Sequence, residues 1–335
     1  MDKIARADAT ERRLVFEAAA ASLGTTPAVV EKDFWVCYTL EHLFHRCSLS
    51  NALTFKGGTS LSKAFHLIQR FSEDVDLILD WRVLGYERDE PWESRSNSAQ
   101  ERFKADAAKR TDAYLRDTFA PALSKSLEKS LEREASVRVG EETETVWFDY
   151  PRTYDSPSTL NSIKLEIGPM AAWSPSEEAM ITPYIIRVMS EDFESLSTTV
   201  RTVSPARTFW EKATILHQEA MRPKEKRMPR RYSRHYYDLY RLGNSSVLEQ
   251  ALSDTALLAR VVEFKEKFYR TPWARLDEAR PGSIRLVPPD FRLEELESDY
   301  RSMSPMLFGE HPTFDEIVRY MHELERRINA SQVNP

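Results

Sequence analysis

The chain has 335 residues, of which 41% are hydrophobic and 30% are charged, a balance typical of a globular protein with a sizeable core. Its formal net charge of −6 argues against a generally basic nucleic-acid coat. No apolar run approaches the roughly 20 residues of a membrane helix, and the N-terminus lacks the apolar core of a signal peptide. The two cysteines are too few for a disulfide framework or a cysteine-based zinc site. We therefore expect a cytoplasmic protein without a membrane partner.

The first part of the chain is predicted to alternate helices with short strands. Thr10 and Thr26 have the residue type of helix N-caps, and Gly24 is expected to stop the helix between them. Hydrophobic periodicity gives the remaining elements. In chain order, these are helices at 10–23 and 26–47, a strand at 53–58, a helix at 60–68, a strand at 75–79, a loop at 81–99, a helix at 100–133, and strands in SVRVG, TVWFDYP and SIKLEIG.

From about residue 205 the sequence is predicted to be mainly helical. Apolar residues at helical spacing, together with the prolines, define its parts. They are helices in FWEKATILHQEA and SRHYYDLYRL, a helix at 246–268, mostly irregular chain at 270–312, and a helix at 313–329. The pattern indicates an α+β fold with a mixed sheet, followed by a helical C-terminal domain. We place the two domains at 1–195 and 196–335.

The glycine pair at 57 and 58 predicts a tight turn in which the main chain can approach a bound group. Thr59 and Ser60 then open a helix, and a helix N-terminus with hydroxyls is suited to hold an anion such as phosphate. The alternative is a simple turn in which one hydroxyl caps the helix.

Two carboxylates follow about sixteen residues later. Asp74 and Asp76 are two residues apart, so on a strand their side chains point to the same face. Paired carboxylates suit Mg²⁺, which takes oxygen ligands and leaves room for phosphate oxygens. The alternative is that Asp74 caps the strand and Asp76 bonds to a neighbouring loop.

SIKLEIG offers a third carboxylate from another strand. Alternation places Lys164, Glu166 and Gly168 on one face, and Glu166 is the candidate for the metal site. A plain surface pair between Lys164 and Glu166 is the competing interpretation.

Together, KGGTSLSK at 56–63 and RFSEDVDL at 70–77 resemble the signature of the AbiEii/AbiGii toxins. These are nucleotidyltransferase-like proteins of abortive-infection and type IV toxin–antitoxin systems, with a fold related to DNA polymerase β. Further stretches resemble the same family, so that the resemblance covers nearly the whole chain: VEKDFWVCYTL (30–40), FWEKATILHQEA (209–220), SRHYYDLYRL (233–242) and DYRSMSPMLFGEHPTFDEIVRYMHELERRIN (299–329).

The resemblance implies roles for the matching residues. Asp74 and Asp76 would hold Mg²⁺, Lys212 would contact the nucleotide phosphates, Asp238 would be a further required acid, and Glu166 would be catalytic. The residues implied in nucleotide binding are Lys56, Gly57, Gly58, Thr59, Ser60, Lys63 and Ser72.

Other roles for three of these residues stay open from the sequence. Lys212 could be a surface lysine at the edge of an apolar stripe. Asp238 could pair with Arg234 or Arg241 on its own helix. Arg70 could neutralise the two aspartates.

The resemblance implies Mg²⁺-dependent transfer of a nucleoside monophosphate from an NTP to an RNA acceptor, the tRNA 3′ end, which would block translation. The run RPKEKRMPRRYSRH at 222–235 lies in the sequence between Lys212 and Asp238 and is strongly basic. Its RNA-binding candidates are Arg227, Arg230, Arg231 and Arg234. The alternatives are phosphoryl transfer, modification of a protein hydroxyl, and a non-catalytic nucleotide-binding role in a defence complex. A cognate antitoxin is the expected protein partner.

Overall fold

The structure is a computed structural model that describes residues 1–155, 160–169, 175–189 and 193–331. The chain divides into two compact units. Unit 1 comprises residues 1–64, 72–171 and 176–202, and unit 2 comprises residues 65–71, 172–175 and 203–335. The predicted domain division after residue 195 stays a prediction, because compactness does not test independent folding.

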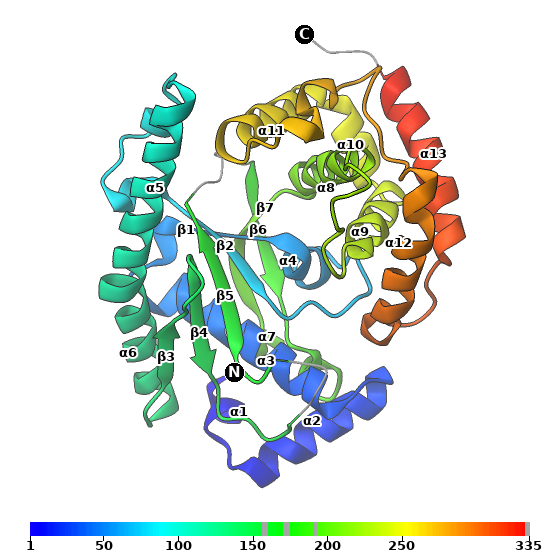
Figure 1. Ribbon diagram of the computed structural model, residues 1–335. Helices are drawn as coiled ribbons and strands as arrows, with labels where there is room; N and C mark the ends of the chain where they lie inside the picture. The colour runs from blue at the N-terminus through cyan, green and yellow to red at the C-terminus, as the bar shows by residue number, and fades with distance from the viewer. Residues whose placement is uncertain (156–159, 170–174, 190–192, 332–335) are drawn as a thin grey trace. The chain divides into compact units, whose positions relative to one another are not determined.

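Seven strands in the described part of the chain form one mixed sheet, in the order β3-β4-β5-β2-β1-β7-β6 (Figure 1). Their bounds are β1 Leu53–Lys56, β2 Val75–Leu79, β3 Ser136–Val139, β4 Thr145–Asp149, β5 Ile163–Gly168, β6 Ser176–Ile181 and β7 Thr198–Val203. β2 is antiparallel to β1 and parallel to β5, and β4 is antiparallel to both β3 and β5. The predicted α+β class with a mixed sheet is confirmed. β6 and β7 lie between SIKLEIG and residue 205, where the sequence predicted no element.

Strict alternation gives the central strands one core face and one polar face. In β5, Ile163, Leu165 and Ile167 are buried, and the residues between them are half-buried. β2 has the same pattern. Since neighbouring residues of a strand point to opposite faces, the buried side chains form the core and the polar ones collect on the other face.

Unit 1 also has helical segments, several of which share one hydrophobic core with the sheet. They are α1 Asp2–Arg6, α2 Ala9–Leu23, α3 Pro27–Glu41, η1 His42–Arg46, η2 Ser50–Ala52, α4 Gly57–Lys63, η3 Trp81–Leu84, η4 Glu90–Trp92, α5 Asn97–Tyr114, η5 Leu115–Phe119, α6 Ala120–Leu131, η6 Tyr184–Arg187 and α7 Phe193–Leu196. In Figure 1, α5, η5 and α6 follow one another as one long rod, as the sequence predicted. α3 is buried along most of its length, and its Trp35 packs against Phe148 and Tyr150 of the sheet region.

Two of the three predicted helix signals are confirmed. Thr26 caps α3 by accepting from the N–H of Val29, and Gly24 ends α2 with a φ of 65°. The N-cap of α2 is Asp8 and not Thr10, because the Asp8 carboxylate accepts from the first-turn N–H groups. An ionised carboxylate also interacts more favourably with the helix dipole than a hydroxyl does.

The helix predicted at 60–68 is shorter and begins earlier, as α4 at Gly57–Lys63. His66 has a positive φ of 53°, which ends helical geometry. The prediction was wrong at this end because the apolar residues of 65–68 serve another purpose: residues 65–71 belong to unit 2.

Unit 2 is helical, as predicted, with two corrections. Its elements are α8 Pro205–Ala220, α9 Ser233–Gly243, α10 Val247–Ser253, α11 Thr255–Phe268, η8 Pro272–Ala274, η9 Leu276–Glu278, α12 Asp290–Met303, η10 Ser304–Met306 and α13 Phe314–Ala330. The single helix predicted at 246–268 is broken at Asp254, whose side chain caps α11. α12 lies within the stretch predicted to be mostly irregular. It buries only Arg292, Leu296, Tyr300 and Met303, so it has few apolar positions from which a helical period could be recognised.

In the part of the chain that the structure describes, none of the helices combines the length and the apolar character needed to cross a membrane.

Candidate functional site

A row of charged side chains crosses the middle of the sheet in unit 1, on the polar face. Lys56 of β1 pairs with Asp76 of β2, and Asp76 pairs in turn with Glu166 of β5. Residues directly opposite each other on paired strands share a face, so these three side chains stand side by side. Asp74 continues the same alternation just before β2. Unit 1 therefore gathers three carboxylates and an amine in one small area.

Gly57 lies against the carboxylate of Asp76. It has a positive φ of 83°, and a Cβ added there would lie 1.9 Å from Oδ2 of Asp76. Both the backbone conformation and the available space therefore favour glycine at this position. The predicted glycine turn is thus a close approach of the main chain to one of the two candidate metal-binding aspartates.

Replacing Gly57 with alanine is expected to lower both stability and activity. The left-handed conformation alone costs a non-glycine residue about 1–3 kcal/mol, and the new methyl group must also displace Asp76. Gly24→Ala is the matched control, since Gly24 has a similar φ of 65° but no atom within 4 Å of the added Cβ. Urea unfolding should show a lower free energy of unfolding for both variants, whereas nucleotidyl-transfer activity should fall only for Gly57→Ala. Equal activity in the two variants would contradict the close approach.

Asp74 is in unfavourable electrostatic surroundings. Its Oδ1 is buried and has no hydrogen-bond partner. Burial, followed by the negative charges of Glu166 and Glu73, raises the pKa of Asp74 above its ordinary value of 3.8. A bound cation would relieve this penalty.

The carboxylates do not form a large metal-binding cluster. Over the described residues, no group of three or more His, Cys, Asp or Glu side chains is arranged to hold a metal ion. Mg²⁺ needs less than this, because one or two carboxylates commonly hold it while waters and substrate phosphates complete its shell. The unpartnered oxygen of Asp74 and the adjacent Asp76 fit that smaller requirement.

Glu166 forms the surface pair that the sequence left open. Its Oε1 lies 2.8 Å from Nζ of Lys164, which also lies 3.1 Å from Glu142, and the Glu166 side chain is 45% exposed. The charge of Glu166 nevertheless reaches Asp74 and raises the pKa of that residue. The ion pair with Lys164 and proximity to the aspartates are therefore compatible.

Glu144, immediately before β4, is an acidic residue in the same region that sequence reasoning missed. It has a positive φ of 63°. Burial raises its pKa, and the positive charge of Lys56 opposes that rise. No local signal distinguishes it, because the turn GEETET contains three glutamates of equal charge.

The hydroxyls of the glycine turn face inward. Thr59 and Ser60 are almost completely buried. Thr59 donates to the carbonyl of Asp74, and Ser60 donates to the carbonyl of Gly57 at 2.8 Å. The hydroxyls thus fix the turn against the start of β2. Contacts with an anion at this turn are left to main-chain N–H groups, which lack partners within the first turn of a helix.

The remaining nucleotide-binding candidates of unit 1 have different surroundings. Lys63 is buried, with its Nζ 2.7 Å from Oδ1 of Asp33 and 4.0 Å from the ring centre of Tyr184. Ser72 is half-buried at the start of the alternation that contains Asp74. The ion pair accounts for the charge of Lys63 within the core, and its contact with a nucleotide stays a prediction.

In unit 2, Asp238 is the centre of a buried ion cluster. Its side chain has no exposed surface; Oδ1 accepts from Nε of Arg70 at 2.7 Å, and Oδ2 lies 2.9 Å from Nζ of Lys212. Burial alone would raise the pKa of Asp238, but Arg70 and Lys212 outweigh it and hold the pKa well below 3.8. A carboxylate that stays ionised between two cations is a poor proton acceptor at neutral pH. Its geometry suits it to hold the cations in place.

The contacts in this cluster exclude two alternative roles that the sequence left open, one for Lys212 and one for Asp238. Lys212 is only 8% exposed and is not a surface lysine. Asp238 pairs with Arg70 and Lys212 and not with an arginine of its own helix. The pairing with Arg70 joins residues 168 positions apart, a separation that no local pattern reveals. His235 is a further member that the sequence did not indicate, since its Nδ1 lies 3.1 Å from Nζ of Lys212.

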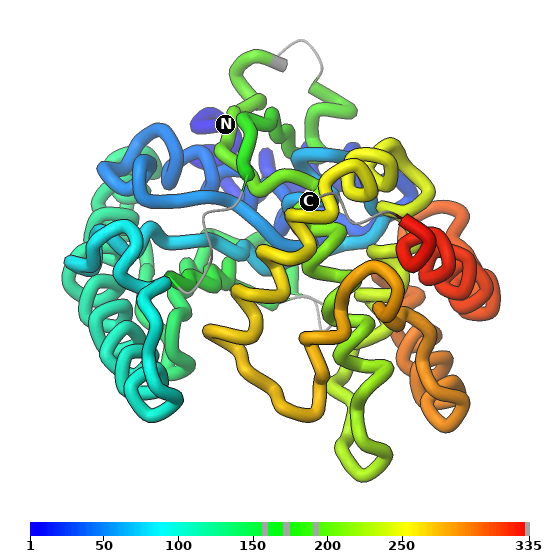
Figure 2. Tube along the Cα trace, turned by 90° about the horizontal axis from the view of Figure 1, so that it is seen from above, coloured from blue at the N-terminus to red at the C-terminus, as the bar shows by residue number. Residues whose placement is uncertain are grey.

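The basic loop, residues 222–232, is anchored at both ends by α12. Nη2 of Arg292 donates to the carbonyls of Pro223, Lys224 and Lys226. The carboxylate of Asp299 accepts from the N–H groups of residues 231 and 233 and from the hydroxyl of the latter. In Figure 2 the loop is the projecting yellow-green turn near the orange α12. α12 therefore gives the loop a defined shape.

Most cationic side chains of this loop are available to solvent, Arg222 being the exception because it pairs with Glu219. Five of them are exposed, and so is the neighbouring Arg234: the loop residues are Lys224, Lys226, Arg227, Arg230 and Arg231. Phe291 of α12 is 46% exposed and lies beneath Lys224, with 5.8 Å between the ammonium and the ring centre. The four arginines predicted to contact RNA are thus all on the surface of unit 2.

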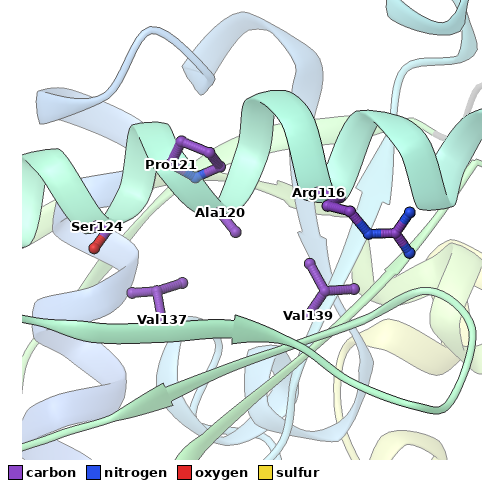
Figure 3. Close-up of a pocket in the computed structure, with 6 residues that line it drawn as sticks. All are labelled: Arg116, Ala120, Pro121, Ser124, Val137 and Val139. Carbon is purple, nitrogen blue, oxygen red and sulfur yellow. The ribbon is translucent and has the colours of Figure 1, made fainter.

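A pocket of about 460 Å³ lies elsewhere in unit 1, between α6 and the edge strand β3 (Figure 3). Its lining includes Val137 and Val139, and Val139 pairs with Val146, which pairs with the buried Leu165. The pocket is therefore on the core face of the sheet, whereas the charged row occupies the opposite face. It contains none of the predicted site residues.

Comparison with known proteins identifies the family. The family model described as "Nucleotidyl transferase AbiEii toxin, Type IV TA system" matches residues 39–320. Among solved structures, the chain is similar to the MenT4 nucleotidyltransferase toxin from Mycobacterium tuberculosis, with 16% sequence identity and a TM-score of 0.45 over 95% of this chain and 99% of that one. None of the curated proteins matches the sequence. Because the family match takes in most of the chain, including the charged row and the Asp238 cluster, this protein belongs to the AbiEii nucleotidyltransferase toxins of type IV toxin–antitoxin systems.

Proposed function

We propose that this nucleotidyltransferase uses Mg²⁺ to transfer a nucleoside monophosphate from an NTP to an RNA acceptor, the 3′ end of a tRNA, and thereby blocks translation. The observation that carries the proposal is the buried, unpartnered Oδ1 of Asp74 beside like charges. A carboxylate so placed is costly unless a cation joins it. The type IV system of the family also implies an antitoxin partner.

In this proposal the acceptor hydroxyl attacks the α-phosphorus, the bond to the β-phosphate oxygen breaks, and pyrophosphate leaves. Asp74 and Asp76 would hold Mg²⁺, which supplies positive charge to the triphosphate when it is bound. Lys212 offsets further charge on the triphosphate. Glu166 takes the proton of the acceptor hydroxyl, since it is a partly exposed carboxylate in the same row.

The basic loop supports a nucleic-acid acceptor. Five of its six arginines and lysines are exposed, while its main chain is held by Arg292 and Asp299. A rigid basic turn loses little conformational entropy when it binds a phosphate backbone. The exposed ring of Phe291 adds a surface on which an unpaired base can stack.

A labelling experiment tests the proposed reaction. The protein is incubated with Mg²⁺, total tRNA and each NTP, labelled at either the α or the γ phosphate. Transfer of the α label to tRNA is the expected result and also identifies the nucleotide. Transfer of the γ label alone would replace the proposal with phosphoryl transfer. An α label that enters protein and not tRNA would move the acceptor to a protein hydroxyl.

Replacing Arg227, Arg230 and Arg231 with glutamine is expected to weaken acceptor binding without changing the KM for the NTP. Each arginine that binds a phosphate should contribute about 0.7 to the log–log slope of RNA affinity against salt, and its removal should reduce that slope accordingly. The control carries Arg301→Gln, Arg319→Gln and Arg326→Gln, which remove the same charge from exposed positions of α12 and α13. Equal loss of affinity in the two triple variants would show that only overall charge matters.

A further inference from the structure

His235 and Asp238 both contact the amine of Lys212. Nζ of Lys212 lies 2.9 Å from Oδ2 of Asp238 and 3.1 Å from Nδ1 of His235. His235 and Asp238 are three residues apart on α9, so their side chains lie on one side of that helix. A lysine ammonium has three N–H donors, of which these contacts take two. The direction of the third is then fixed by the other two.

The contact also fixes the state of the imidazole. A lysine ammonium can only donate, so Nδ1 of His235 must accept, and the ring proton must be on Nε2. The surroundings favour this neutral form. Burial, followed by the positive charges of Lys212 and Arg234, holds the pKa of His235 well below its ordinary value of 6.5, although Asp238 opposes that effect. His235 is therefore a neutral acceptor at physiological pH.

Neighbouring side chains restrict the orientation of the ring. Tyr232 packs edge-on against His235, with 4.8 Å between the ring centres. On the other side of the amine, Asp238 is itself held by both Nε and Nη2 of Arg70. Lys212 is thus confined between two acceptors that are themselves held in place. A long lysine side chain would otherwise sample many rotamers.

We propose that His235 is a positioning residue which, together with Asp238, aims the third N–H of Lys212 at the phosphates of the nucleotide. The inference rests on the proposed contact between Lys212 and the triphosphate. His235 donates nothing to the substrate; it acts only through the amine. Placing a charged donor in advance removes reorganisation from the transition state, and a misplacement of about 1 Å can cost 10²-fold in rate.

The test compares His235→Asn with His235→Leu. The asparagine amide can bring its oxygen near the position of Nδ1 and keep an acceptor for Lys212, whereas leucine fills similar space without one. The first readout is acylation of the Lys212 amine, followed by mass spectrometry of its peptide, with increasing concentrations of each of the four NTPs. Protection of Lys212 by a nucleotide reports the contact without requiring transfer.

The expected result is that His235→Leu needs at least about tenfold more NTP for half-protection and loses about 10- to 100-fold in kcat/KM, while His235→Asn stays near the wild type in both. His217→Asn is the matched control. His217 is a buried histidine on α8 with both ring nitrogens bonded, to the carbonyl of Arg275 and the N–H of Arg285. This variant should lower stability and leave half-protection unchanged.

Equal behaviour of the asparagine and leucine variants would overturn the proposal, because a role in packing does not depend on an acceptor. Absence of nucleotide protection at Lys212 in the wild type would also overturn it, while α-label transfer in that same protein would leave the proposed function standing. Conversely, protection that depends on His235 in a protein without α-label transfer would support the positioning role and refute the proposed reaction.

Discussion

Asp74→Asn is expected to abolish nucleotidyl transfer while leaving the folded protein at least as stable as the wild type. The carboxylate is half-buried, with an unpartnered oxygen and like charges nearby. Its folded-state pKa is raised, so its ionised form opposes folding at every pH above its unfolded pKa, and the amide removes that penalty. Loss of the metal ligand should cost several kcal/mol in the transition state, roughly 10³-fold in rate.

Two measurements check this prediction. Urea unfolding in EDTA should give Asp74→Asn an equal or higher midpoint than the wild type, and added Mg²⁺ with NTP should stabilise the wild type alone. Asp80→Asn is the control, because Asp80 follows the other end of β2 and caps the N–H of Arg82, which asparagine can also do. Retained nucleotidyl transfer by Asp74→Asn would show that Asp74 is not a metal ligand. A large loss of stability in this variant would show that the ionised carboxylate of Asp74 does not oppose folding.

Asp238→Ala is expected to give a large loss of stability. Removing this carboxylate leaves Arg70 and Lys212 as buried cations without their shared partner. Breaking a buried ion pair in this way typically costs about 3–5 kcal/mol. The pKa of Asp238 is depressed from 3.8, so its contribution is fully present above that value and is lost as the pH falls through the folded-state pKa. Urea unfolding should therefore show the largest difference near neutral pH and a smaller one below about pH 4.

An apolar replacement of the whole cluster separates stability from function. The triple variant Arg70→Met, Asp238→Leu, Lys212→Met contains no unpaired buried charge, so it should recover most of the stability lost in Asp238→Ala. It should remain inactive in the transfer assay, because the amine proposed to contact the triphosphate is gone. A triple variant no more stable than Asp238→Ala would show that the cluster matters for packing more than for charge.

The local sequence pattern was sufficient to predict where a side chain lies when this depends only on the strand, helix or turn that contains the residue. The alternation predicted one face for Asp74, Asp76 and Glu166, and the register of β2 and β5 confirms it for Asp76 and Glu166, which lie directly opposite each other. Gly57 was found for the same reason. A position with a positive φ and no room for a side chain beside Asp76 requires glycine, and a glycine can be recognised in the sequence. The local sequence pattern was insufficient to predict a helix end where a short apolar run can pack in either of two ways, as at 65–68. It was also insufficient to predict a helix that buries few residues, such as α12.

The sequence by itself determined the order and type of most elements, the polar face of the sheet and the family signature, because these depend on periodicity and on residues close in the chain. Only the tertiary structure decided that Arg70 and Lys212 share Asp238, that His235 faces the same amine, and that Arg292 and Asp299 hold the basic loop. Charge partners are selected by proximity after folding. Any of 47 lysines and arginines could have paired with Asp238, and burial at one point in space is what selects two of them.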